Sequence, residues 1–290
     1  MKTKKRLLVV GMMLIAAGLI LITSAFTRAQ SNQFTIPLSD PSKRGTLKVN
    51  LNVGSITVKG SARKDVMIKY SSETNEEAED EHEERGGNRN GERTDTDSKA
   101  GLRRIGGGGM DLEATENNNQ VTIRSGSWNH HLDLEIEIPS GMDLELHTYN
   151  DGDLMVSNVQ GELALSNYNG EITALNISGS VVASTYNGEI KVTLDKVTDA
   201  TPMSFSTFNG DIDVTFPATL KATLKMKTQQ GEIFTGFDIT ISDNAPVQMK
   251  DTKAGVYKVV IDDWKTGQVN GGGAEITMKN YNGDIIVRKK

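Results

Sequence analysis

The sequence predicts an all-β protein, and more specifically a β-solenoid or β-roll built from short strands. Between residues 152 and 188 a glycine recurs every nine residues, and apolar residues follow each glycine at the second and fourth positions. Asn-Gly, a strong turn signal, occupies the corner before several of these strands. A fixed short period of this kind is typical of repeat proteins whose units bury their apolar faces by stacking.

Two nine-residue units are expected to form one 18-residue coil, because a Tyr-Asn-Gly version alternates with a plainer version (Val-Gln-Gly or Ile-Ser-Gly). Each unit supplies one short strand and one corner, with the acid after the glycine pointing outward and the next apolar residue pointing inward. The glycines that set the period are Gly152, Gly161, Gly170, Gly179 and Gly188. An antiparallel β-sandwich or barrel made from the same short strands is the alternative fold.

Stacked coils would place Tyr168 above Tyr186, with Tyr149 and Phe208 near the same column. This column alternates along the chain with apolar residues such as Ile177. We therefore expect the aromatic column to lie in the core. If it were exposed, it could serve as a platform for stacking carbohydrate.

The acids of the repeat are expected to form an outward surface ladder, and they are the candidate site residues: Asp153, Glu171, Glu189, Asp211 and Asp284. Such a ladder suggests calcium, but each unit has one glycine rather than the three of the calcium-binding nonapeptides, and the acid varies in length. A solvated face that protects the strands from aggregation is the favoured interpretation. No metal, cofactor or catalytic residue is predicted.

The remaining metal-ligand residue types give no recognisable site. His130, His131 and His147 have no carboxylate at a familiar ligand offset, and adjacent residues of a strand point to opposite faces. The chain has no cysteine, so disulfides and thiolate sites are excluded. Nucleophile-elbow, P-loop, dinucleotide-binding and HExxH motifs are all missing from the sequence, which argues against the enzymes that use them.

The chain divides into a leader (1–29), a polar linker (30–45) and a repetitive β domain (46–290). The leader has a basic start followed by an apolar run over 7–26, and Thr27-Arg28-Ala29 would permit cleavage before Gln30. An uncleaved membrane anchor is the alternative, since the apolar run could span a bilayer. Both possibilities place the domain outside the cytoplasm.

Residues 71–119 differ in kind from the repeats and are expected to form a disordered acidic insert. Glu76 to Glu84 is strongly acidic, and glycine and asparagine dominate much of the rest. The formal net charge is −6, and loss of five leader cations makes it −11. A negative protein is a poor partner for nucleic acid, and it repels acidic polymers.

The repeats resemble those of the DUF4097 family, a bacterial family of suggested adhesins. The resemblance rests on the Tyr-Asn-Gly-acid-Ile copies, on the lead-in from Ile136 to Leu144, and on the closing segment from Ile276 to Ile285. It covers about Leu47 to Arg288, without the acidic insert. The resemblance implies a repetitive extracytoplasmic β domain with a role in adhesion or the cell envelope, and it carries no catalytic residues.

The function expected is that of a non-catalytic, exported cell-envelope protein. It would act as an adhesin-like or scaffold solenoid that contacts a surface component, either a glycan or a protein. It would touch the membrane only through its N-terminal segment, if that segment is not cleaved. One alternative is a polysaccharide-active enzyme that uses carboxylates such as Glu171 and Glu189. Another is an envelope-stress sensor or partner-binding module that acts through the insert.

Overall fold

The computed structural model describes residues 32–74, 112–128, 130–243, 247–250, 257–260 and 264–290. The leader and residues 75–111 of the acidic insert lie outside these ranges, so the predictions made for them are not addressed by the structure. The described residues contain strands and turns, and the expectation of an all-β fold is confirmed. Within the same residues there is no helix long and apolar enough to cross a membrane.

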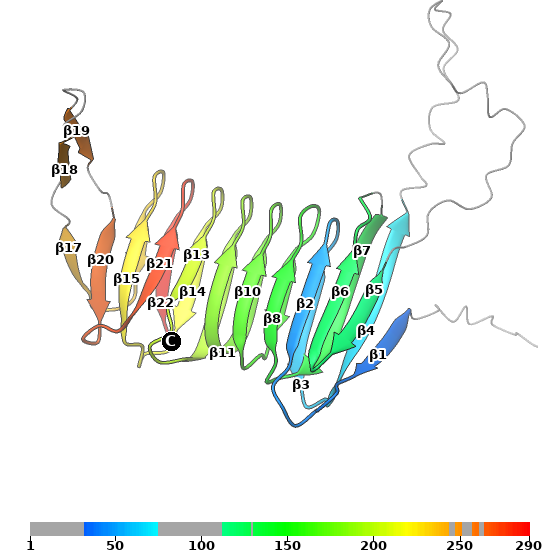
Figure 1. The fold of residues 1–290 in the computed structure, drawn as a ribbon. Helices are drawn as coiled ribbons and strands as arrows, with labels where there is room; N and C mark the ends of the chain where they lie inside the picture. Colours follow the sequence, from blue (N-terminus) through cyan, green and yellow to red (C-terminus); the bar gives the residue numbers. More distant parts are fainter. Residues whose placement is uncertain (1–31, 75–111, 129, 244–246, 251–256, 261–263) are drawn as a thin grey trace, which may run out of the picture. The chain divides into compact units, whose positions relative to one another are not determined.

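The strands form two long stacks, here named sheet A and sheet B, which are joined by corners (Figure 1). In spatial order, sheet A contains β4 (Asp65–Thr74), β7 (His130–Pro139), β3 (Ile56–Ser61), β9 (Leu154–Ser157), the first part of β11 (Ile172–Ser184), β12 (Ile190–Val197), β14 (Ile212–Phe216), β22 (Ile285–Lys289) and β16 (Ile233–Thr235). Most neighbouring strands in this stack are parallel.

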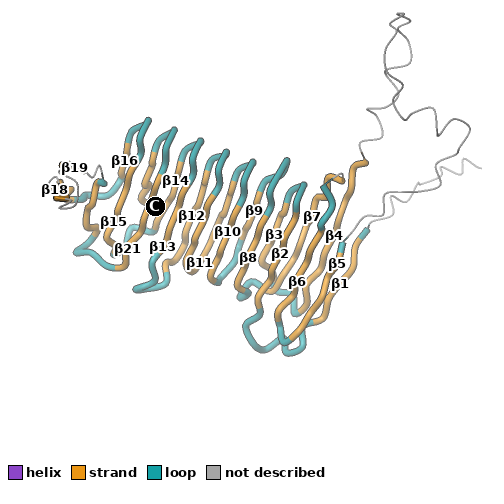
Figure 2. The backbone as a smooth tube through the Cα atoms, turned by 45° about the horizontal axis from the view of Figure 1, so that its top comes forward, coloured by secondary structure: helices purple, strands orange, loops and turns teal. Residues whose placement is uncertain are grey.

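Sheet B contains, in spatial order, β5 (Glu113–Asn117), β6 (Gln120–Ser125), β2 (Thr46–Leu51), β8 (Asp143–His147), β10 (Glu162–Ser166), the second part of β11, β13 (Met203–Ser206), β21 (Ala274–Lys279), β15 (Ala222–Lys227), β20 (Lys265–Val269) and β17 (Thr240–Asp243). A separate antiparallel hairpin joins β18 (Val247–Lys250) to β19 (Tyr257–Val260). Figure 2 shows the corners through which the chain passes between the two stacks in the successive coils.

The register confirms the 18-residue coil. Leu163 of β10 pairs with Val181 of β11, and Ile172 of β11 pairs with Ile190 of β12. Both pairs are parallel, whereas a sandwich or barrel of hairpins would pair its strands antiparallel. The β-solenoid prediction is therefore correct, and the alternative fold is wrong.

The coils do not stack in chain order at either end of the solenoid. The first coil, β2–β3, lies between β6–β7 and β8–β9. The last coil, β21–β22, lies between β13–β14 and β15–β16. Each terminal coil is thus held on both sides by segments distant in sequence, which removes the frayed terminal rung that sequential stacking would leave.

Antiparallel strands close several edges of the stack. At the N-terminal end, β4 and β1 (Gln33–Pro37) continue sheet A, and β5 continues sheet B. At the other end, β20 and β17 continue sheet B. Antiparallel additions of this kind block further parallel stacking on the sheet that they cover.

One apolar core runs between the two sheets. Inward positions of successive coils lie over one another, as with Leu163 and Val181 in sheet B and Ile172 and Ile190 in sheet A, and all four are buried. Burying a large aliphatic side chain stabilises a fold by about 1.5–3 kcal/mol before entropy is counted. A single thin coil cannot offset its own ordering entropy, so the stack folds as a unit.

Two predicted boundaries need correction. Residues 33–37 of the expected linker form β1, because Phe34 and Ile36 pack on the core beside β4. The expected insert at 71–119 is shorter, since β4 continues to Thr74 and residues 113–117 form β5, which pairs with β6. These strand ends are polar, so composition gave no signal for them; backbone pairing with β7 and β6 holds them instead.

A glycine substitution at one corner tests how closely the coils approach. The backbone of Gly210 has φ +132°, and a Cβ atom there would lie 2.2 Å from the carbonyl oxygen of Gly188 in the next coil. We expect Gly210→Ala to lower the free energy of unfolding by at least about 2 kcal/mol, from backbone strain and the clash together. Urea unfolding followed by circular dichroism measures this.

Gly141→Ala is the matched control, because nothing lies within 4 Å of its added Cβ and its φ is not strained. It should change the free energy of unfolding by less than about 0.5 kcal/mol. Equal effects of the two substitutions would show that the coils are not packed backbone to backbone at this corner.

Candidate functional site

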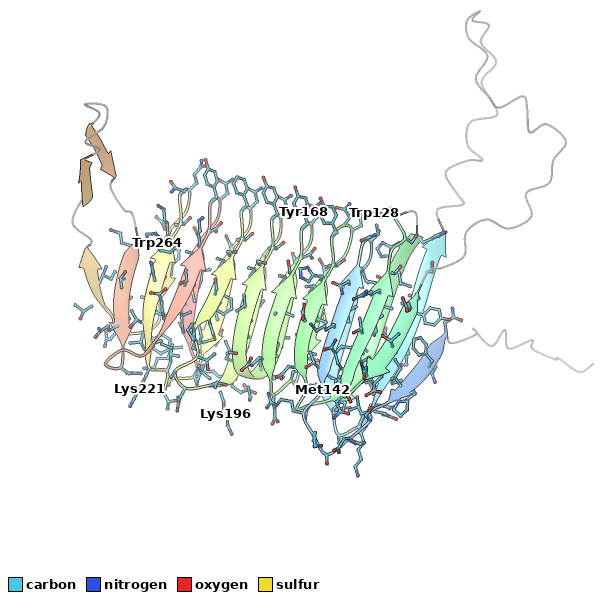
Figure 3. The ribbon with its side chains drawn as sticks, in the orientation of Figure 1. Trp128, Met142, Tyr168, Lys196, Lys221 and Trp264 are labelled. Carbon is cyan, nitrogen blue, oxygen red and sulfur yellow. The ribbon has the colours of Figure 1, made fainter. Side chains whose placement is uncertain are left out.

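The candidate site is the corner that leads from sheet B to sheet A, where six coils carry the same kinds of side chain. From 167 to 172 this corner reads Asn-Tyr-Asn-Gly-Glu-Ile, and from 207 to 212 it reads Thr-Phe-Asn-Gly-Asp-Ile. The parallel register places each position of one corner over the same position of the next. Four rows of identical or similar side chains therefore run along one edge of the solenoid (Figure 3).

The first row is a ladder of asparagine side chains. Asn169 Nδ2 donates to Asn150 Oδ1 at 2.9 Å, and Asn187 Nδ2 donates to Asn169 Oδ1 at 2.8 Å. The ladder continues from Asn209 to Asn187 at 2.7 Å and from Asn282 to Asn209 at 2.6 Å. Each internal amide both donates and accepts along the ladder, so the ladder satisfies these groups without solvent.

The second row consists of inward-pointing polar side chains that donate to glycine carbonyls of the neighbouring coil. Thr185 Oγ1 donates to the Gly170 oxygen at 3.0 Å, and Thr207 Oγ1 donates to the Gly188 oxygen at 3.0 Å. Equivalent bonds come from Thr148, Asn167, Asn280 and Thr228. These bonds cap the corner carbonyls, which have no strand partner there, so the row stabilises the fold and is not available to a ligand.

The third row is a stack of aromatic rings on the surface. Tyr149, Tyr168, Tyr186, Phe208 and Tyr281 stack with centroids 4.7–5.0 Å apart and interplanar angles of 0–9°. Trp128 contacts the end ring, Tyr149, edge to face at 5.5 Å. The six side chains are 37–58% exposed. We name these six residues the aromatic ladder.

The prediction that this column lies in the core is wrong. Tyr168 is three residues after the buried Leu165, so strict alternation in an extended chain turns its ring outward. The plainer corner differs because Asn176 has φ +58°, and this left-handed residue rotates the next side chain, Ile177, back into the core. The two kinds of corner recur at the same nine-residue spacing, but the side chain before the corner points outward in one and inward in the other.

Stacking also decides which part of each ring a ligand can reach. The faces of the internal rings are covered by their neighbours, so the ladder presents ring edges to solvent. Sugar rings stack on aromatic faces, and those faces carry the negative side of the ring quadrupole, whereas the edges are positive. The internal rings therefore cannot serve as a platform on which carbohydrate stacks.

The fourth row is the acid ladder, which holds one acid from each of these corners: Asp153, Glu171, Glu189, Asp211 and Asp284. The structure adds Glu232, in the degenerate corner beside Asp284. Asp153 Oδ1 accepts the backbone N–H of Glu171, Asp211 Oδ1 accepts that of Asp284, and Asp284 Oδ1 accepts that of Glu232, all at 2.8 Å. Aspartate is short enough to reach the next coil, which explains why the acid varies in length.

The acid ladder generates a negative field along the edge. The pKa of Glu189 is raised above its ordinary value by partial burial and by the nearby charges of Glu171, Asp211 and Asp213, although Lys191 opposes the effect. In the described part of the chain, none of the six ladder carboxylates forms an ion pair, and no group of three metal-ligand residues comes together. The ladder is therefore a row of negative charges with no ion-pair partner among the described residues.

Among the described residues, His130, His131 and His147 do not come together in a group of three metal ligands. His131 Nε2 lies 3.0 Å from Asp133 Oδ1, two residues along the same face of β7. That contact supplies a pair, and two ligands are too few for a stable metal site in a protein.

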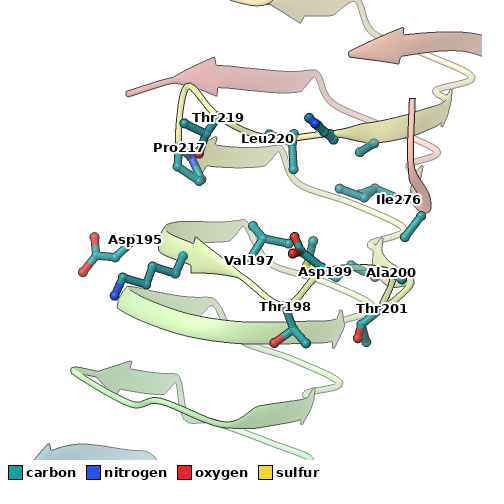
Figure 4. A pocket seen from close by; sticks show the side chains of 15 residues that line it. Asp195, Val197, Thr198, Asp199, Ala200, Thr201, Pro217, Thr219, Leu220 and Ile276 are labelled. Carbon is teal, nitrogen blue, oxygen red and sulfur yellow. The ribbon is translucent and has the colours of Figure 1, made fainter. Parts of the chain in front are cut away.

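A pocket of about 400 Å³ lies elsewhere, at the end of the strands opposite to the aromatic ladder (Figures 3 and 4). It is formed where the chain passes from β12 to β13 and from β14 to β15, around Asp199, Thr201, Pro217 and Lys221. Asp195 at its rim pairs with Lys290. No ladder carboxylate lines this pocket. The carboxylates named for the polysaccharide-active alternative, Glu171 and Glu189, lie on an open corner instead.

Comparison with known protein families identifies the domain. The Toastrack DUF4097 model matches residues 104–287, which is more than half of the chain. The chain belongs to the DUF4097 family. The match begins at residue 104, within the expected insert, rather than at Leu47, so the first coil of this DUF4097 protein lies outside the matched range although it stacks inside the solenoid.

Two solved structures are similar to this DUF4097 protein at low identity. A candidate cell adhesion protein from Clostridium sporogenes has 10% identity and a TM-score of 0.36, with 90% of this chain and 100% of that chain covered. A candidate adhesin from Bacteroides fragilis has 10% identity and a TM-score of 0.28, with 89% and 96% covered. Among curated proteins, none matches.

Removing one rung of the asparagine ladder should weaken the domain. Asn187→Ala deletes two side-chain hydrogen bonds and leaves Asn169 and Asn209 each short of a partner. We expect the free energy of unfolding to fall by about 1–3 kcal/mol, measured by urea denaturation. Gln160→Ala is the control, because that amide is exposed and stands outside the ladder; equal losses in the two variants would contradict the role given to the ladder.

The acid ladder gives a pH-dependent prediction. A raised folded-state pKa means that ionised Glu189 opposes folding above its ordinary pKa, and that this cost disappears once the group is protonated in both states. Glu189→Gln should therefore raise the free energy of unfolding at pH 7, by up to about 0.5 kcal/mol, and make no difference near about pH 3.

Glu162→Gln is the matched control, since that exposed carboxylate lies at the opposite corner. Thermal unfolding of both variants between about pH 3 and pH 7 shows whether the stability gain is specific to Glu189 or follows from removing any exposed carboxylate. A Glu189→Gln variant that is less stable than the parent at pH 7 would show that repulsion does not dominate at this position.

Proposed function

We propose that this DUF4097 protein is a non-catalytic, exported binding or scaffold module, adhesin-like, whose contact surface is the aromatic ladder. The observation that carries the proposal is the exposure of six contiguous aromatic side chains on one edge of a rigid stack. Contiguous exposed apolar side chains on a soluble domain mark surfaces that contact other molecules. The partner is a component of the cell envelope or of another surface.

The rigid scaffold supports this proposal. Ring-on-ring stacking and the asparagine ladder fix the rings before any partner arrives, so little side-chain entropy is lost on binding. The absence of catalytic motifs from the sequence and the open position of Glu171 and Glu189 favour binding over turnover. The sequence of the leader favours export with the domain outside the cytoplasm.

Replacing two central rings should weaken binding to envelope components. The double variant Tyr168→Ser, Tyr186→Ser removes two stacked rings, and aromatic anchors at interfaces contribute about 1–2 kcal/mol or more each. We expect at least about tenfold weaker binding of the purified domain to isolated envelopes, measured by fluorescence anisotropy or co-sedimentation. Circular dichroism confirms that the variant is folded.

Phe234→Ser is the matched control, because Phe234 is an exposed aromatic residue on β16 outside the ladder. Loss of binding in the control but not in the double variant would place the contact surface elsewhere. Cell fractionation tests export, and recovery of the protein from the cytosol with its leader intact would overturn that part of the proposal.

A further inference from the structure

Two parallel rows, one aromatic and one acidic, run along the same edge of the solenoid. In four of the corners only an asparagine and a glycine separate the ring from the acid, as Tyr186 and Glu189 illustrate. Because five neighbouring coils each contribute one ring and one carboxylate, both rows repeat at the spacing of parallel strands, about 4.7–4.9 Å. A ligand that lies along this edge meets an apolar row and a negative row together.

The acid ladder is poised to accept positive charge from outside the protein. Arg288 is engaged by Asp213, and Lys290 by Asp195, so these two basic side chains near the C-terminus are already paired. Asp153, Asp211 and Asp284 use Oδ1 for backbone N–H groups of the next coil, which fixes the carboxylates and leaves each Oδ2 for another partner. Partial burial, together with the nearby charges of Glu171 and Asp211, raises the pKa of Glu189.

The aromatic ladder restricts how such a ligand can bind. A cation cannot sit over the internal ring faces, since neighbouring rings cover them. The exposed ring edges are instead suited to apolar packing. Lysine and arginine combine an apolar stem with a charged head, so their stems can lie on the ring edges while their heads reach the carboxylates.

From these rows, we infer that this edge binds an extended basic segment of another protein, with lysine or arginine side chains laid across the aromatic ladder toward the acid ladder. The inference rests on the proposed function and names the chemistry of its partner. Charge complementarity commits the edge to a basic ligand. The covered ring faces favour a protein segment over a glycan, because the stacking mode that sugars use is blocked.

The experiment measures binding of a fluorescein-labelled peptide of alternating lysine and threonine to the domain, with a glutamate–threonine peptide as the negative probe. We expect the basic peptide to bind and the acidic one not to bind. The acid-ladder variant Glu171→Gln, Glu189→Gln should weaken binding of the basic peptide about tenfold. Raising the salt concentration from about 0.1 M to about 1 M should weaken binding to the parent protein as well.

Glu162→Gln, Glu275→Gln is the matched control, because it removes the same charge from exposed positions at the starts of β10 and β21, at the opposite corner. Equal loss in the control and the ladder variant would overturn the inference, since net charge alone would then explain binding. Binding of a cationic glycan in place of the basic peptide would also overturn it.

The tyrosine double variant distinguishes this inference from the proposed function. If it loses binding to envelopes while the basic peptide never binds the parent protein, the ladder is a contact surface for a partner of other chemistry, and only the present inference fails. If it keeps full binding to both envelopes and peptide, both the inference and the proposed function fail.

Discussion

In-register parallel stacking is the constraint on which the rest of the structure depends. Because Leu163 pairs with Val181 and each corner lies over the next, the inward and corner side chains have chemically similar neighbours one coil away. This arrangement favours amides, which both donate and accept, and aromatic rings, which stack. It opposes carboxylates, which repel one another, and this repulsion adds to partial burial in raising the pKa of Glu189. Where the acid is aspartate, a hydrogen bond to the next coil offsets part of that repulsion.

The same constraint explains how the ends of the domain are built. A coil stabilises its neighbours through shared strands, so a terminal coil with one neighbour is the weakest part of a solenoid. Here the first and last coils each lie between two others, and antiparallel strands cover the outer edges of several stacks. Long-range pairing of this kind slows folding, because distant segments must meet before either is stable.

The period could be predicted from the sequence because it is set locally, by glycine spacing and by apolar residues at fixed offsets. The spatial order of the coils could not be predicted from the sequence. All coils present similar inward side chains, and nothing in the spacing shows which coil stacks on which. The exposed position of Tyr168 could have been predicted from its separation from Leu165, because an odd number of residues along an extended chain reverses the direction of a side chain. The prediction failed because Tyr168 and Ile177 have the same spacing from the following glycine, which suggested the same direction for both. The left-handed conformation of Asn176, which makes Ile177 differ from Tyr168, is a backbone property that asparagine permits without requiring.

The composition of the aromatic ladder bears on what the edge recognises. Phe208 replaces tyrosine within the row, yet its ring is parallel to that of Tyr186 with an interplanar angle of 0°. The stack therefore requires a ring at this position and does not require a hydroxyl. A partner that depended on a regular line of phenolic hydroxyls would meet a gap there, whereas one that packs on ring edges would not. Each rung then offers a similar weak contact, and affinity depends on how many rungs one ligand spans at once.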